Sequence, residues 1–146
     1  MVPRIVAISP PRAGPWVDAL ADLHGSGVDA IILRLLETPG DLPGALAAAR
    51  KAGLRVFVRP VLPGDADAAI AEGAGLHLPD HGPPARRGAV LTSTSCHDAG
   101  RVVQAADARL DFCTLAPVFS PGSKPGDTRP VLGLAGLRAA TREAPG

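Results

Sequence analysis

The sequence predicts an α/β fold in which six parallel strands alternate with helices. Near-continuous apolar runs, such as 28–35 and 111–116, are typical of strands buried on both faces. Segments with apolar residues at helical spacing follow these runs, so that strands recur roughly every 25 residues. Two architectures accept this alternation: an open doubly wound sheet, or part of an eight-unit barrel.

Proline and glycine separate the predicted elements. Gly53 is the expected C-cap of the helix that precedes it, and Asp98 is a good N-cap or first-turn acid. The polar interval 79–84 leaves room for barely one helical turn. The predicted strands are 4–9, 28–35, 55–59, 75–78, 89–93 and 111–116, and the predicted helices are 16–23, 41–52, 65–72, 98–108 and 132–140.

Composition limits the classes of partner. The 146 residues are 46% hydrophobic and 20% charged, which indicates one globular domain over residues 1–146. A net charge of +1 and only one Trp, three Phe and no Tyr argue against nucleic acid. No apolar run has the length of a membrane span, and the N-terminus lacks a signal-peptide pattern, so we expect a cytoplasmic protein with no membrane partner. Cys96 and Cys113 fit neither a disulfide framework nor a metal motif, and we expect inert, reduced thiols.

The stretch from Asp111 to Ala139 carries the strongest local signal of a binding site. It reads as a strand, a loop over 117–130 and a helix, and the loop contains Ser123, Lys124 and two glycines. A hydroxyl, small-residue N–H groups and a lysine can bind phosphate, although a mobile surface connection has the same composition.

Polar residues also stand at other predicted strand ends, where both candidate architectures bind ligands. No Gly-x-Gly-x-x-Gly turn or Walker-type loop is present, which argues against a nucleotide-binding open sheet. Arg59 suits an anion or, equally, an ordinary salt bridge. The polar residues at strand ends are Ser9, Arg34, Arg59, Asp80, 93–98 and 120–124.

Three pieces of the chain together carry a resemblance to a known family. They are 27–34 (GVDAIILR), 75–78 (GLHL), and the segment 95–98 (SCHD) with its continuation in 111–134. These pieces resemble the thiamin phosphate synthase and TenI family, most sharply in the last third. The resemblance implies a TIM-barrel-type (β/α)8 barrel, of which six βα units are visible before Gly146. We therefore expect a truncated or divergent barrel, or one in which another copy of the chain covers the open edge.

The resemblance also implies an activity and a set of phosphate-binding residues. The synthase joins a hydroxymethylpyrimidine diphosphate to a thiazole phosphate, with loss of pyrophosphate and help from magnesium. By position, Arg34 would contact the diphosphate, and Ser95 would contact phosphate from the end of the fifth strand. Ser123 and Lys124 would hold phosphate in the loop after the sixth strand.

The chain departs from the family at the magnesium ligands. The family's Asn-Asp pair after the third strand falls at about Pro63-Gly64, and its Gly-Gln-x-Asp segment becomes 79–82. Asp65 or Asp80 could substitute only if the loops shift, because Mg²⁺ demands a strict octahedron of oxygen ligands. We therefore expect no resident cofactor, with Mg²⁺ possible by resemblance alone. The TenI branch, which includes a thiazole tautomerase, does not need magnesium.

Other departures affect phosphate contacts and acid–base chemistry. Ile32 and Leu36 replace the family's glutamine and lysine on either side of Arg34, and Pro121 replaces the first threonine of the phosphate loop. Pro117 stands where the tautomerase has its histidine.

Three histidines remain as candidates for acid–base chemistry. His77 also fits a hydrogen-bonded strand residue, and His97 fits a residue at the start of a helix that bonds backbone. His81 is expected to be a solvated loop residue.

These observations predict a thiamin-phosphate-synthase/TenI-like protein that binds a phosphorylated thiazole or pyrimidine precursor at the strand ends. The alternative is a non-catalytic barrel that binds or senses a phosphorylated ligand, and a third interpretation is a purely structural remnant. A homo-oligomer is compatible with either of the first two.

Overall fold

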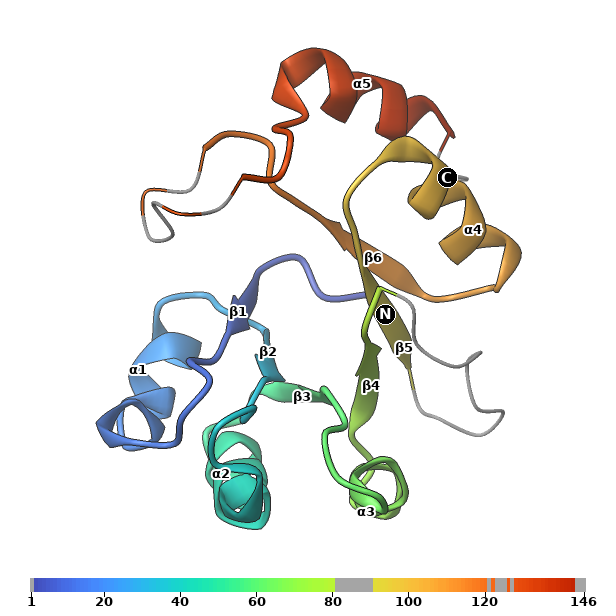
Figure 1. The fold of residues 1–146 in the computed structure, drawn as a ribbon. Coiled ribbons are helices and arrows are strands. Elements are labelled where there is room, and N and C mark those ends of the chain that lie inside the picture. The colour runs from blue at the N-terminus through green and yellow to red at the C-terminus, as the bar shows by residue number, and fades with distance from the viewer. Residues whose placement is uncertain (1, 81–90, 121, 123–125, 127, 144–146) are drawn as a thin grey trace. The chain divides into compact units, whose positions relative to one another are not determined.

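The chain alternates strands and helices, as a computed structural model of residues 2–80, 91–120, 122, 126 and 128–143 shows (Figure 1). Every strand is short, and short 3₁₀ turns precede two of the helices. The elements are β1 (Val6–Ile8), η1 (Pro15–Val17), α1 (Leu20–Gly25), β2 (Ala30–Leu33), η2 (Pro39–Asp41), α2 (Leu42–Lys51), β3 (Arg55–Val58), α3 (Asp65–Ala71), β4 (Gly75–Leu78), β5 (Thr92–Cys96), α4 (Ala99–Asp107), β6 (Phe112–Leu115) and α5 (Gly133–Glu143).

The strands follow one another in chain order in the sheet, from β1 to β6. The paired strands of the described chain are parallel, and a helix follows each of β1, β2, β3, β5 and β6. The predicted TIM-barrel-type βα repeat of six strands is therefore confirmed.

The chain forms two compact units. The N-terminal unit runs to His77 and includes Leu91 and Thr92, while the C-terminal unit contains Leu78–Asp80 and the chain from Ser93 onward. The organisation of 1–146 as a single domain stays a prediction. No helix in the described residues is long and apolar enough to cross a membrane.

In the N-terminal unit, β2 lies between β1 and β3, and all four of its side chains are buried. The helix α2 contributes the buried face Leu42, Ala45, Leu46 and Ala49, which recurs every three to four residues as an amphipathic helix requires. The C-cap of α2 is Ala52 rather than the predicted Gly53, which follows it with φ of 79°, a left-handed conformation that glycine adopts at little cost.

One row of the sheet shows how closely β3 and β4 pack. The parallel register aligns Ile8 with Ile32, Ile32 with Phe57, and Phe57 with Gly75. Ile32 and Phe57 are fully buried. A Cβ atom on Gly75 would lie 2.6 Å from the ring of Phe57 and 2.8 Å from the carbonyl oxygen of Leu91. Position 75 must therefore be glycine for the Phe57 ring to occupy its site.

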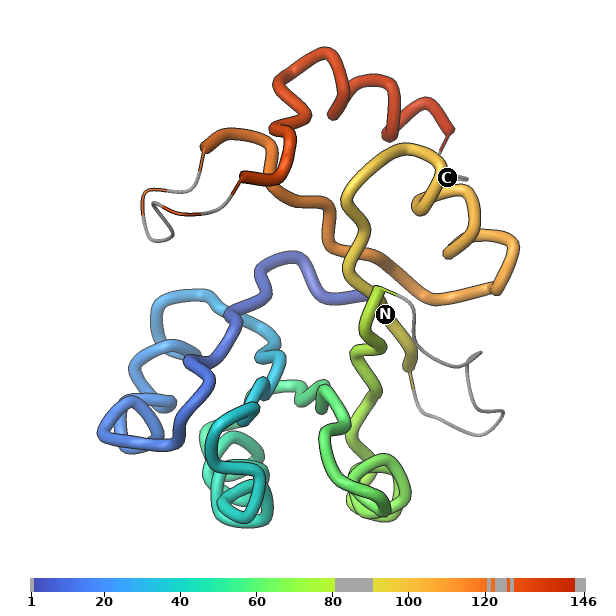
Figure 2. The backbone as a smooth tube through the Cα atoms, viewed as in Figure 1, coloured from blue at the N-terminus to red at the C-terminus, as the bar shows by residue number. Residues whose placement is uncertain are grey.

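In the C-terminal unit, α4 and β5 share a small apolar cluster with α5, made by Cys96, Val102, Ala105 and Ala140. Figure 2 traces the chain from β6 through its loop into α5. The base of that loop is closed by two backbone bonds, from Leu132 N–H to the Pro117 carbonyl and from Gly133 N–H to the Val118 carbonyl. The Ala116–Pro117 peptide bond is cis.

Two predicted elements were placed wrongly. The fifth strand spans Thr92–Cys96 and so continues past the predicted end at residue 93, while residues 89 and 90 of the predicted strand lie outside the described residues. The hydroxyl-rich segment is buried there, and Thr94 donates to the carbonyl of Leu78 at 3.0 Å. The first helix begins at Leu20 rather than residue 16, because a separate 3₁₀ turn occupies Pro15–Val17. The indole of Trp16 bonds back to the carbonyl of Arg12 at 2.8 Å.

Replacing Asp98 by alanine is expected to destabilise the protein by about 1 kcal/mol. The Asp98 side chain accepts a hydrogen bond from Arg101 N–H at 2.8 Å, which satisfies one of the first free N–H groups of α4. Urea unfolding measures the change. Asp107→Ala, at the opposite end of α4, is the matched control and should be neutral or slightly stabilising, because an acid there opposes the helix dipole. Equal effects of the two variants would contradict the cap.

Candidate functional site

Three basic side chains occupy one row at the carboxyl ends of β2, β3 and β4. Leu33 pairs with Val58, and Val58 pairs with Leu76, so the next row brings together Arg34, Arg59 and His77. The Arg59 N–H donates to the Leu33 carbonyl at 3.0 Å, which extends the register past the last strand residue. Residues in one row of parallel strands point to the same face, about 4.8 Å from their neighbours. This row, termed here the basic row, is the candidate anion site of the N-terminal unit.

The backbone of Arg34 is held in place, and no carboxylate in the described residues pairs with its side chain. Its backbone N–H donates to the Ser9 hydroxyl at 2.8 Å, which ties β2 to the residue following β1. Its Nε atom is buried, and no hydrogen-bond partner for it lies among the described residues. Burial and the charge of Arg59 lower the pKa of Arg34. Within the described chain, no carboxylate forms an ion pair with Arg34 or Arg59.

His77 is the third member of the basic row and is neutral at pH 7. It lies in β4 with 3% of its surface exposed. Burial, and then the charges of Arg59 and Arg34, lower its pKa from 6.5 to about 4. Desolvation and nearby cations both oppose the imidazolium form. The row therefore carries two positive charges that no histidine or carboxylate in the described residues offsets, and it suits an anion.

The predicted site residues of the C-terminal unit lie at the end of β5. Ser95 is half-buried and aligns with Thr114 of β6. His97 follows β5 directly, and its Nδ1 lies 2.5 Å from the carbonyl oxygen of Ala116. Because a carbonyl only accepts, Nδ1 carries the proton and Nε2 is left as an acceptor. The bond to backbone predicted for His97 is thus present, while its acid–base role stays a prediction.

Arg129 joins this end of the C-terminal unit from the loop before α5. Its guanidinium lies 3.4 Å from Nε2 of His97, so it faces the acceptor atom of the imidazole. Arg129 lies in the segment 111–134 that carries the family resemblance, but the sequence analysis gave it no role, because spacing does not show its contact with His97. The loop residues Ser123 and Lys124, and also His81 and Pro121, lie outside the described residues.

The carboxylates that could have replaced the missing magnesium ligands are already engaged. Asp65 Oδ2 accepts from the N–H groups of Val61 and Leu62, both at 2.8 Å. Asp80 Oδ1 accepts from Arg101 Nε at 2.6 Å. No group of three or more His, Cys, Asp or Glu side chains in the described residues could hold a metal ion. Asp65 and Asp80 therefore do not fit a Mg²⁺ site.

The two cysteines lie on neighbouring strands, as predicted, and their environment is that of inert thiols. Cys96 is buried in β5, and Cys113 is half-buried in β6. Burial and the adjacent Cys113 thiol raise the pKa of Cys96 to about 12. A thiol that stays protonated at neutral pH is a poor nucleophile.

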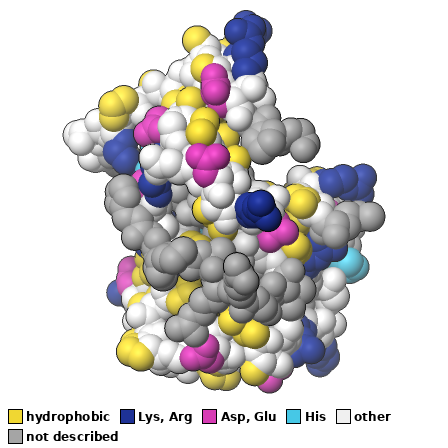
Figure 3. All heavy atoms as spheres, turned by 90° about the vertical axis from the view of Figure 1, so that its right-hand side faces the viewer, with side chains coloured by type: hydrophobic (Ala, Val, Ile, Leu, Met, Phe, Trp, Pro, Cys, Tyr) yellow, Lys and Arg dark blue, Asp and Glu magenta, His cyan; other side chains and the backbone are white. Residues whose placement is uncertain are grey.

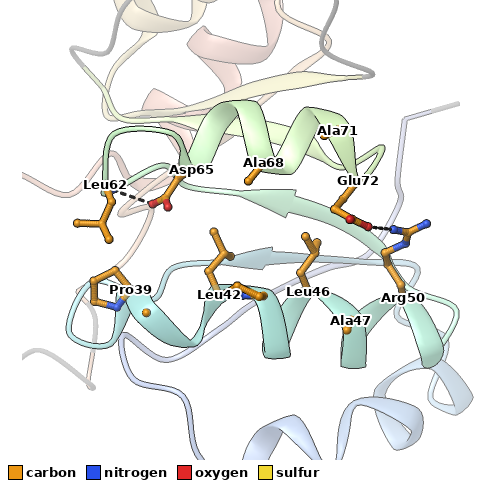
Figure 4. A pocket seen from close by; sticks show the side chains of 12 residues that line it. Pro39, Leu42, Leu46, Ala47, Arg50, Leu62, Asp65, Ala68, Ala71 and Glu72 are labelled. Carbon is orange, nitrogen blue, oxygen red and sulfur yellow. Dashed lines mark hydrogen bonds and ion pairs between the residues drawn. The ribbon is translucent and has the colours of Figure 1, made fainter.

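A groove of about 700 Å³ runs between α2 and α3, apart from the basic row (Figure 4). Leu42 and Leu46 project into it from α2 toward Ala68 of α3, and an ion pair between Arg50 and Glu72 closes one end. Its lining is mostly apolar, and none of the predicted site residues contributes to it.

On the face shown in Figure 3, Lys and Arg side chains are interspersed with Asp and Glu among the described residues.

The fold and the strand-end position of the basic row define a TIM-barrel-like α/β protein with a candidate anion site at the usual location for that architecture. Among solved structures, the chain is similar to a thiamine phosphate pyrophosphorylase from Pyrococcus furiosus. The TM-score is 0.74 at 22% identity, over 97% of this chain and 71% of that one, which shows a shared fold. No family model matches the sequence, and no curated protein sequence matches it either.

Proposed function

We propose that the chain is a thiamin-phosphate-synthase/TenI-like protein of thiamin metabolism that binds a phosphorylated thiazole or pyrimidine precursor. The observation that carries this proposal is the basic row, with Arg34, Arg59 and neutral His77 in register at the strand ends. The shared fold with a thiamine phosphate pyrophosphorylase supports the choice of heterocyclic phosphates among possible anions. Ser95, Ser123 and Lys124, all in the C-terminal part of the chain, stay proposed phosphate contacts on the resemblance alone.

The chemistry available to these residues is recognition and charge neutralisation. When pyrophosphate leaves a pyrimidine diphosphate, negative charge develops on it, and guanidinium groups beside it can neutralise that charge. Neutral His77 adds no charge to the site. His97 and His77 are the proposed proton carriers if the protein turns substrate over.

A non-catalytic phosphate-binding or regulatory protein is the second proposal. The engagement of Asp65 and Asp80 in other bonds favours it, because the synthase reaction is assisted by magnesium and these were the available replacement ligands. Both proposals predict binding, and only the first predicts product.

Isothermal titration with thiazole phosphate and with hydroxymethylpyrimidine diphosphate tests the shared part. We expect both to bind, the unphosphorylated heterocycles to bind weakly or not at all, and Arg34→Gln and Lys124→Ala each to weaken binding by at least about tenfold. Incubating both compounds with the protein and magnesium, then assaying released pyrophosphate, separates enzyme from binding protein. Failure of every phosphorylated compound to bind would overturn both proposals and leave the structural remnant.

A further inference from the structure

We propose that Arg34 and Arg59 act as a pair that binds a phosphate or diphosphate group directly, so that binding needs no divalent cation. This inference rests on the proposed function, because it specifies how the same strand ends neutralise a phosphorylated ligand. It assigns to Arg59 a role that neither the resemblance nor the shared fold gives it.

The register makes the pair. Arg34 and Arg59 each follow the last residue of a strand, and the pairing of Leu33 with Val58 sets them side by side. The bond from Arg59 N–H to the Leu33 carbonyl, at 3.0 Å, and that from Arg34 N–H to the Ser9 hydroxyl, at 2.8 Å, fix both backbones. Each guanidinium offers a planar fork of donors, which matches phosphate oxygens.

The environment of the pair calls for an anion. The Arg34 Nε is buried without a partner, and within the described residues neither guanidinium meets a carboxylate. Two partly desolvated cations side by side repel each other, and a buried donor without an acceptor costs free energy. A dianionic phosphate between them removes both penalties. The neighbour of Arg59 in the basic row, His77, is neutral, and the residues that precede the two arginines, Leu33 and Val58, are apolar. None of these residues supplies a negative charge.

The same arrangement disfavours a divalent cation. Mg²⁺ placed among two guanidinium groups would be repelled, and no cluster of three or more His, Cys, Asp or Glu side chains in the described residues could hold it. Asp65, the acid nearest in sequence to the end of β3, already accepts two backbone N–H groups. The guanidinium of Arg59 thus supplies the positive charge that a metal ion would otherwise bring to the phosphate.

Titration of the full chain with inorganic pyrophosphate, in EDTA and then in excess magnesium, tests this inference. We expect binding in EDTA, with Arg59→Gln and Arg34→Gln each weakening it by about 10- to 100-fold. Arg55→Gln is the matched control: it removes the same charge from the other end of β3, where the side chain is exposed, and should leave affinity within about twofold. Arg59→Lys keeps the charge but not the fork, and should retain part of the affinity.

The outcomes separate the inference from the proposed function. Two outcomes overturn the paired-arginine inference alone. In the first, binding appears only with magnesium. In the second, Arg34→Gln abolishes binding while Arg59→Gln and Arg59→Lys leave it unchanged. Absence of binding by any phosphorylated compound, with or without magnesium, overturns the proposed function as well. Circular dichroism shows whether each variant is folded. If Arg59→Gln does not fold, the comparison of Arg59→Lys with wild type still tests the inference.

Discussion

Acidification from pH 7.5 to 4.5 is expected to destabilise the wild-type fold by about 2 to 3 kcal/mol more than a His77→Gln variant. The pKa of His77 falls from 6.5 to about 4 on folding, mainly through burial and then through Arg59 and Arg34. Between these two values the unfolded chain binds a proton that the folded chain does not. Stability therefore falls as the pH is lowered through this window and is unaffected by His77 above it.

Urea unfolding of both proteins at several pH values gives the difference directly. The comparison uses the slope with pH, so a constant destabilisation by the glutamine substitution does not affect it. Parallel curves for the two proteins would show that His77 titrates normally and that the basic row is more solvated than its burial indicates.

Replacing Gly75 by alanine is expected to destabilise the protein by about 3 kcal/mol. The new methyl group would lie 2.6 Å from the Phe57 ring and 2.8 Å from the Leu91 carbonyl oxygen. Phe57 is fully buried, so its ring has no solvent to move into, and the carbonyl belongs to backbone. Thermal or urea unfolding measures the loss.

Two further variants make the Gly75 experiment specific. Gly44→Ala, on α2 with no atom within 4 Å of the added carbon, should be neutral or stabilise by up to about 1 kcal/mol. Phe57→Leu should recover part of the loss when combined with Gly75→Ala, because it removes one of the two close contacts. A Gly75→Ala protein as stable as wild type would contradict the close approach of β3, β4 and residue 91.

Periodicity predicted most of the fold, and its failures have physical causes. The 75–78 strand was predicted to the residue, since apolar side chains and glycine bound it clearly. The fifth strand was displaced toward Ala89, Val90 and Leu91 because apolar content guided the assignment. The buried residues of this strand include Thr92 to Thr94, and hydrogen bonds such as that from Thr94 to the Leu78 carbonyl offset the cost of burying their hydroxyl groups.

The candidate site was less accessible to sequence reasoning than the fold. Arg34 was found because its motif resembles a family pattern, whereas Arg59 looked as much like a salt-bridge partner as an anion ligand. What decides between them is register, because only the alignment of β2 with β3 shows that the two arginines are neighbours. The predicted strands 28–35 and 55–59 end one residue beyond Arg34 and at Arg59, so counting from their ends would have missed the alignment by one residue.

The most direct test of the basic row as a phosphate site is the pKa of His77, measured by NMR of its imidazole with and without saturating pyrophosphate in EDTA. A bound anion offsets the charges of Arg34 and Arg59, so the pKa should rise from about 4 toward the ordinary value of 6.5. A His77 pKa that does not change while pyrophosphate binds would place the anion elsewhere and contradict the account.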